Sequence, residues 1–180
     1  MSSDAAPSMS AHNHEEMPTF EEISDIKRLR DINLTFKGQL TKVYNAYLKM
    51  NDAFVDSNAK AVASEANRVI KAIESVDMAL LKGDPHMKWM DQLEMLNSAI
   101  GAISKSNDIE KQRHEYIQFN LAFYKSIKMF GLESTTTYFQ YCPMANNDKG
   151  AYWLSNTKDI LNPYFGDAML RCGETKETIK

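Results

Sequence analysis

Two cysteines and two methionines near the C-terminus form the pattern with the clearest chemical meaning. Cys142 and Met144 are two residues apart, so an extended chain would place both side chains on the same side. Met169 and Cys172 are three residues apart, which places them on one face of a helical turn. If the two segments meet, two thiolates and two thioethers converge. Such sulfur ligands suit Cu(I) or Ag(I), and Zn(II) can bind through the thiolates.

A disulfide between Cys142 and Cys172 is the alternative interpretation of the same residues. In an oxidising compartment a single pair of cysteines usually forms a bridge. Closing a loop of about 30 residues would stabilise the fold by roughly 3 kcal/mol. Spacing alone leaves three states open: a disulfide, two inert buried thiols and a metal site.

The histidines offer further ligands for a soft metal. His12 and His14 lie between two methionines within residues 9–17, a composition that can capture copper without folding. His86 shares a helix face with Met90 at spacing i, i+4. These three histidines are therefore auxiliary metal-ligand candidates, with a solvated side chain as the alternative for each.

Methionine is unusually frequent, at 11 of 180 residues. Its flexible side chain fills gaps in protein cores, and its thioether is also a soft metal ligand. Met50, Met78, Met95 and Met129 lie within helical patterns. We expect core packing for most of the methionines, these four included.

Catalytic motifs are missing from the sequence. It contains no G-x-S-x-G, H-E-x-x-H, phosphate loop or G-x-G-x-x-G. Cys142 as a nucleophile would need a histidine base, either His86 or His114. His114 follows Glu110 by four residues, but the paired Glu-x-x-His motifs of di-iron bundles are lacking. We therefore expect a protein that is not an enzyme.

Length and charge limit the class of protein. The chain has 180 residues, a net charge of −3 and 43% hydrophobic residues, which is typical of one globular domain. Nucleic-acid binding is not expected, because it needs an excess of Lys and Arg. No stretch approaches the roughly 18 apolar residues of a membrane span. Residues 1–19 lack the features of a secretory signal, although a start rich in small residues suits an exported protein whose signal has been removed.

Hydrophobic periodicity predicts a mainly α-helical fold. Residues 1–20 are poor in branched apolar side chains and are expected to form a disordered tail. Residues 21–133 hold four amphipathic segments, joined by short connections that force sequential neighbours to pack antiparallel. The segments run from about Asp25 to Phe54, from Ala59 to Val76, from His86 to about Ser104, and from a cap at 106–108 to Gly131. The sequence thus predicts an antiparallel up-down four-helix bundle.

Residues 134–180 differ in character from the bundle. Residues 135–141 are mainly β-branched and aromatic, and both cysteines follow the fourth helix, together with turn-forming Pro, Gly and Asn residues. We expect a small irregular C-terminal subdomain with short strands and one or two helical turns, packed on one end of the bundle. Trp153, Tyr164 and Phe165 could form an aromatic binding surface, although aromatic residues in a small subdomain usually make its core.

Four short motifs and the helical part together carry a resemblance to a known family. The motifs are Y-C-P-M-A at 141–145, G-A-Y-W-L-S at 150–155, N-P-Y-F-G at 162–166 and M-L-R-C-G at 169–173, and H-M-K-W-M at 86–90 represents the helices. The chain resembles, from roughly Leu34 to Ile179, uncharacterised periplasmic domains found alone or appended to adaptor subunits of Cus-type copper and silver efflux pumps.

The resemblance implies a periplasmic or secreted, non-enzymatic domain linked to heavy-metal handling. It implies binding of Cu(I) or Ag(I) for delivery to an efflux machine, with an efflux-pump adaptor or another periplasmic protein as partner. It does not name the ligands. Cys142, Met144, Met169 and Cys172 are inferred from ligand softness and lie inside the matching motifs, with His12, His14 and His86 as auxiliary ligands.

The competing hypothesis is an interaction module without a metal. In it a Cys142–Cys172 disulfide stabilises the C-terminal subdomain, and the aromatic surface of Trp153, Tyr164 and Phe165 binds a partner protein or a small ligand.

Overall fold

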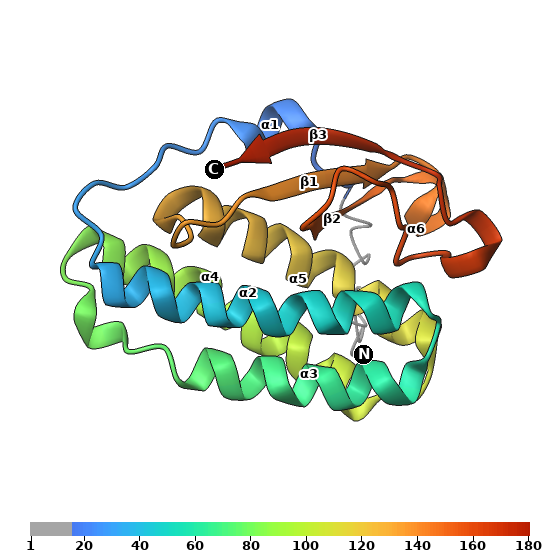
Figure 1. Ribbon diagram of the computed structural model, residues 1–180, viewed down its shortest axis with the longest axis horizontal. Coiled ribbons are helices and arrows are strands. Elements are labelled where there is room, and N and C mark those ends of the chain that lie inside the picture. Colours follow the sequence, from blue (N-terminus) through green and yellow to red (C-terminus); the bar gives the residue numbers. More distant parts are fainter. Residues whose placement is uncertain (1–15) are drawn as a thin grey trace, which may run out of the picture.

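The computed structural model describes residues 16–180 and shows a mainly helical protein with one small antiparallel sheet (Figure 1). Four long helices form a bundle, as predicted. None of the helices in residues 16–180 is long and apolar enough to cross a membrane. In chain order the elements are α1 (Phe20–Ser24), α2 (Leu34–Val55), α3 (Ala59–Glu74), the 3-10 turn η1 (Met78–Leu80), α4 (Asp84–Lys105), α5 (Ile109–Phe130), β1 (Thr137–Cys142), α6 (Ala145–Asp148), β2 (Ala151–Ser155), the 3-10 turn η2 (Gly166–Met169) and β3 (Glu174–Ile179).

Local capping residues set the helix ends close to the predicted positions. The side chains of Asn33, Asn58 and Asp108 accept hydrogen bonds from backbone N–H groups in the first turns of α2, α3 and α5. Gly131 ends α5 with φ 79°, a conformation that favours glycine. Each helix packs against the next one in sequence, so the up-down bundle is confirmed.

The sheet has the strand order β2-β1-β3 and lies along the side of the bundle (Figure 1). At one end of α5 the Arg113 side chain donates to the carbonyl of Pro163, and at the other end Lys128 pairs with Glu177 of β3. The expectation that the C-terminal subdomain packs on one end of the bundle is therefore wrong. The sheet has an apolar inner face, on which the Phe139 ring stacks on that of Tyr124 with ring centroids 3.8 Å apart. This face is buried by packing along α5.

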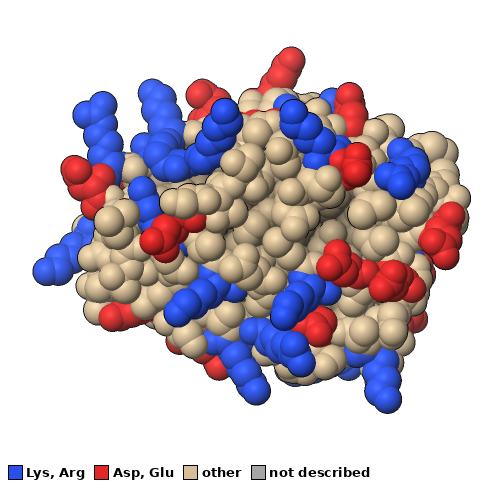
Figure 2. Space-filling model, viewed as in Figure 1, with Lys and Arg blue, Asp and Glu red and all other residues tan. Residues whose placement is uncertain are grey.

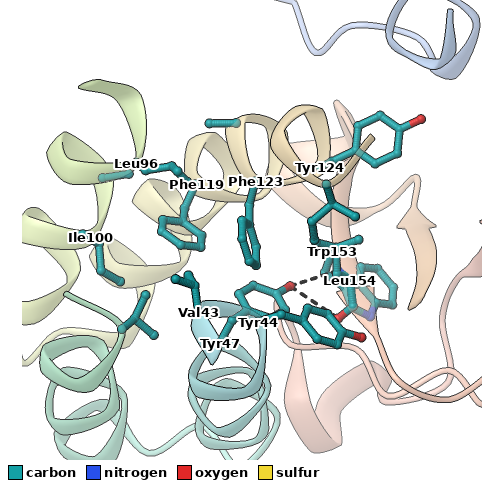
Figure 3. Packing of buried hydrophobic residues seen from close by; sticks show 14 of the residues in the cluster. Val43, Tyr44, Tyr47, Leu96, Ile100, Phe119, Phe123, Tyr124, Trp153 and Leu154 are labelled. Carbon is teal, nitrogen blue, oxygen red and sulfur yellow. Dashed lines mark hydrogen bonds between the residues drawn. The ribbon is translucent and has the colours of Figure 1, made fainter. Parts of the chain in front are cut away.

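Buried tyrosine hydroxyls join the sheet to the helices (Figure 3). The Tyr47 hydroxyl donates to Asn120 Oδ1 of α5 at 2.6 Å and accepts from the Leu154 N–H of β2 at 2.9 Å. The Tyr44 hydroxyl donates to Thr137 Oγ1 of β1 at 2.8 Å. These bonds satisfy polar groups inside the core and fix the position of the sheet on α2 and α5.

Residues 16–20, at the end of the segment expected to be disordered, contact the folded part of the chain. Thr19 and Glu22 form a reciprocal capping box at the start of α1. The Tyr152 hydroxyl donates to the Pro18 carbonyl at 3.1 Å, and Met17 is partly buried against the core. These residues belong to the folded unit, and the rest of the expected tail lies outside the described residues.

The methionines divide between the core and the surface. Met50 and Met129 are buried as predicted, but Met78 and Met95 are exposed. Further exposed methionines are Met87, Met90 and Met144. The prediction that most methionines pack in the core is therefore wrong for residues 16–180. In α4 the buried face is filled by other side chains, such as Trp89 and Leu96.

Charged side chains are mixed over the surface. On the face shown in Figure 2, basic and acidic residues are interspersed around an uncharged central area. Both signs of charge are therefore present on this side of the molecule.

Candidate functional site

The two cysteines meet, although 30 residues separate them in the sequence. Cys142 is the last residue of β1, and Cys172 lies just before β3. Their Sγ atoms are 3.0 Å apart, and both residues are free thiols. Cys142 is fully buried, whereas Cys172 is partly exposed. The two segments therefore meet at their thiols, and the pair is more accessible from the side of Cys172.

Asn162 holds the loop that brings Cys172 to Cys142. Its side-chain Nδ2 donates to the Cys172 carbonyl, and its Oδ1 accepts from the Tyr164 N–H, both at 2.9 Å. Its backbone N–H donates to the Leu170 carbonyl and its carbonyl accepts from the Gly166 N–H. One buried side chain thus closes the segment from 162 to 172 at both ends, which explains the asparagine in N-P-Y-F-G.

A glycine next to Cys172 allows this loop to pass close to the sheet. Gly173 has φ 143°, in the region that favours glycine. A Cβ at this position would lie 2.8 Å from the Tyr141 carbonyl oxygen and 2.9 Å from the Trp153 ring. The absence of a side chain therefore permits the short distance between the two thiols.

The neighbouring thiol and burial raise the pKa of Cys172 to about 11. The largest contribution is the hydrogen bond with Cys142, because it stabilises the protonated thiol. The reduced pair consequently holds a proton on Cys172 at neutral pH, and a metal ion must displace that proton to bind the sulfur.

Alkylation of the reduced protein should show this high pKa directly. The thiolate is the reactive form, so a pKa near 11 in place of 9.0 lowers the rate at Cys172 about 100-fold at pH 8. The rate should still rise about tenfold per pH unit at pH 10, as followed by mass spectrometry. In Cys142→Ala the midpoint of the curve of alkylation rate against pH should fall toward pH 9, because the neighbouring thiol is gone. A wild-type midpoint near 9 would contradict this assignment.

The two predicted methionine ligands lie in a separate cleft. Met144 and Met169 line a hollow of about 400 Å³ together with His114 of α5. Among the described residues that line this cleft, neither cysteine is present. The four predicted sulfur ligands are therefore arranged as two pairs: the thiol pair Cys142/Cys172, and a thioether pair that shares its cleft with a histidine.

A strained turn forms one wall of this cleft. Asn146, Asn147 and Asp148 have φ values of 55°, 52° and 63°, so three successive residues other than glycine adopt the left-handed conformation. Asn and Asp tolerate it better than other residues, but it remains costly. Such strain is often retained at functional sites.

The predicted auxiliary histidines do not join either pair in the described structure. His12 and His14 lie outside residues 16–180. His86 is in the first turn of α4, and α4 runs antiparallel to α5, so His86 lies at the opposite end of the bundle from the cleft at Glu110–Ile117. Residues 16–180 hold no group of three or more His, Cys, Asp or Glu that could bind a metal ion.

The predicted aromatic surface is wrong for two of its three residues. Trp153 is 1% exposed and Tyr164 is 6% exposed, while Phe165 is partly buried. Every residue of β2, which carries Trp153, is buried. The Tyr164 hydroxyl accepts from Asn120 and donates to the Tyr152 carbonyl inside the core. The aromatic residues thus form the core that joins sheet and bundle.

His114 is the site residue that sequence reasoning missed. Its spacing from Glu110 matches no metal motif, and the other residues of its cleft include the turn after β1 and η2. No local spacing signals a contact between segments that are 30 or more residues apart.

The fold and the site define a helical bundle that carries a C-terminal sheet and a thiol pair. Residues 43–135 match the DUF3347 family, described as a protein of unknown function, and this match covers just over half of the chain. The chain belongs to this family. Comparisons with curated proteins and with solved structures give no match. The matched range spans most of α2 through α5 and ends before β1, so both cysteines lie outside it.

Proposed function

We propose that this protein binds a soft metal ion, Cu(I) or Ag(I), through the thiol pair of Cys142 and Cys172. The observation that carries the proposal is the 3.0 Å distance between two sulfur atoms that come from separate segments. Asn162 and Gly173 hold these segments together. Thiolate sulfur is the ligand type that selects Cu(I).

The number of available donors favours Cu(I) and Ag(I) over Zn(II). Zinc sites in proteins take three or four protein ligands in tetrahedral geometry. No third His, Cys, Asp or Glu accompanies the two thiols within residues 16–180. Two thiolates on opposite sides of one ion satisfy the low coordination number of Cu(I) and Ag(I), so the pair discriminates against zinc.

Metal binding requires a small opening of the pair. With metal–sulfur distances of about 2.3 Å, two sulfurs on opposite sides of an ion are about 4.6 Å apart. The sulfurs must therefore separate by about 1.6 Å from their present 3.0 Å. Cys142 is held in β1, so the partly exposed loop that carries Cys172 would supply this movement.

We place this activity in heavy-metal handling in the periplasm or outside the cell, with an efflux-pump adaptor or another periplasmic protein as receiver. The support is the resemblance of the motifs at 141–145, 150–155, 162–166 and 169–173 to domains associated with copper and silver efflux. In an oxidising compartment the same thiols can form a disulfide, so the reduced protein is the metal-binding form.

The test is a chelator competition with the reduced protein. Cu(I), Ag(I) and Zn(II) are titrated in parallel into the wild type and into the variant Cys142→Ser, Cys172→Ser. We expect the wild type to bind one equivalent of Cu(I) or Ag(I) tightly and the variant to bind it at least 100-fold more weakly. The affinity of the wild type should rise with pH, because binding displaces thiol protons. Zn(II) should bind weakly to both proteins.

Two results would overturn the proposal. One is equal affinity for Cu(I) in the wild type and the double variant. The other is a freshly isolated protein without free thiols that fails to bind Cu(I) after reduction. The second result would assign the pair to a structural disulfide and favour an interaction module.

A further inference from the structure

The cleft beside η2 combines donors that the thiol pair lacks. His114 comes from α5, Met144 from the turn after β1 and Met169 from η2, and all three line the same hollow of about 400 Å³. The Met144 side chain is 48% exposed, so its thioether is at the surface and does not fill a core gap. Imidazole nitrogen and thioether sulfur are neutral donors that bind Cu(I) or Ag(I) without losing a proton.

A second hollow shares part of its lining with the first. It shares His114, Ile117 and Asn146 with the cleft, and it is lined also by Met17 and Met95. Met95 is exposed, and Met17 is held at the edge of the core. His114 therefore lines two hollows, each of which is also lined by two methionines.

The charges around the cleft suit a monovalent cation. Glu110 and Asp148 line it, and the only cationic side chain of its lining among the described residues is Arg113. The Arg113 guanidinium is buried and is bonded to Glu110, Ser57 and two backbone carbonyls. Its charge is thus compensated within the protein and does not need an anion in the cleft.

We infer that His114, Met144 and Met169 form a second binding site for Cu(I) or Ag(I), distinct from the thiol pair. Its use in metal handling rests on the proposed function, because the site would capture the ion and pass it to the thiols. The two sites share two segments: Met144 follows Cys142 by two residues, and the Cys172 N–H donates to the Met169 carbonyl. In the transfer, bonds from the ion to thioether and imidazole break, two metal–thiolate bonds form, and the thiol protons leave to solvent.

Because its donors are neutral thioethers and an imidazole, the second site should still bind metal after the thiols are oxidised. A disulfide between Cys142 and Cys172 would abolish the first site, whereas the thioethers and the imidazole would keep their lone pairs. The affinity of the second site should be lower than that of the reduced thiol pair, because two thioethers and an imidazole replace two thiolates as ligands.

The test is an Ag(I) titration of the variant Cys142→Ser, Cys172→Ser, followed by NMR of the methionine methyl groups and the histidine rings. We expect saturable shifts at Met144, Met169 and His114. Met87 is the matched control, because it is also exposed but lies at the far end of the bundle. Equal shifts at all exposed methionines, or none in the cleft, would overturn the inference. If the variant fails to fold, wild-type protein with oxidised thiols takes its place.

Two sets of substitutions complete the test in the same background. Met144→Leu with Met169→Leu conserves side-chain volume and removes both thioethers, so Ag(I) affinity should fall at least tenfold. Met87→Leu with Met90→Leu should leave it unchanged. If Met144→Leu with Met169→Leu leaves the affinity for Ag(I) unchanged, the proposed second site is contradicted. If reduced wild-type protein fails to bind an equivalent of Cu(I) or Ag(I) that depends on the two thiols, the proposed function is contradicted instead. The two failures are therefore distinguishable.

Discussion

Arg113→Ala is expected to destabilise the protein by about 3 kcal/mol. The guanidinium is buried, and its Nε donates to the Pro163 carbonyl at 2.9 Å. Its Nη2 donates to the Phe54 carbonyl and to Ser57 Oγ, and its Nη1 to Glu110. Truncation leaves the Pro163 carbonyl without its donor and removes one of the two donors to the Phe54 carbonyl, which also accepts from the Ser57 N–H. It also separates the loop after Asn162 from the end of α2. Urea denaturation of the two proteins measures the loss.

Two further variants show whether these bonds cause the effect. Arg113→Lys keeps the charge, but one ammonium group cannot reach acceptors on three segments, so it should recover less than half of the lost stability. Arg68→Ala is the matched control, because Arg68 is exposed and pairs only with Glu65, and it should change stability by less than about 0.5 kcal/mol. A loss below about 1 kcal/mol for Arg113→Ala would mean that the desolvation of the guanidinium cancels its hydrogen bonds.

Local signals explain why the helical bundle could be predicted from the sequence. The polar residues at 56–58 and 106–108 cap or end helices through bonds to nearby backbone groups, and Gly131 ends α5 by its own backbone preference. The short helix α1 carried the same kind of signal, Thr19 with Glu22, but its segment has too few apolar residues to show a helical period.

Long-range packing explains what the sequence did not show. Every residue of β2 is buried, so the strand lacks the alternation that would have distinguished an inner from an outer face for Trp153. The pairing of Cys142 with Cys172 could be anticipated because the sequence has only two cysteines, so any cysteine pair within the chain must join them. His114 could not, since the two loops that bring Met144 and Met169 to it are placed by the sheet on α5.

Asn162→Ala should weaken both the fold and the proposed metal site, although its side chain is not a predicted ligand. The side chain is fully buried and bonds to the Cys172 carbonyl and the Tyr164 N–H. Its loss leaves the buried Tyr164 N–H without an acceptor and frees the loop that holds Cys172, at a cost of about 2–4 kcal/mol. Cu(I) affinity of the reduced protein should fall at least tenfold, because the thiols are no longer held together.

The thiols themselves report on this positioning role. In Asn162→Ala, alkylation of Cys172 at pH 8 should accelerate, because distance from Cys142 lowers its pKa toward 9.0 and exposure increases. Asn156→Ala in the exposed segment after β2 is the matched control and should change neither stability nor alkylation. If stability falls while the Cys172 rate and the Cu(I) affinity stay at wild-type values, Asn162 supports the loop without positioning the thiol. Gly173 and the pairing of β1 with β3 would then hold Cys172 beside Cys142.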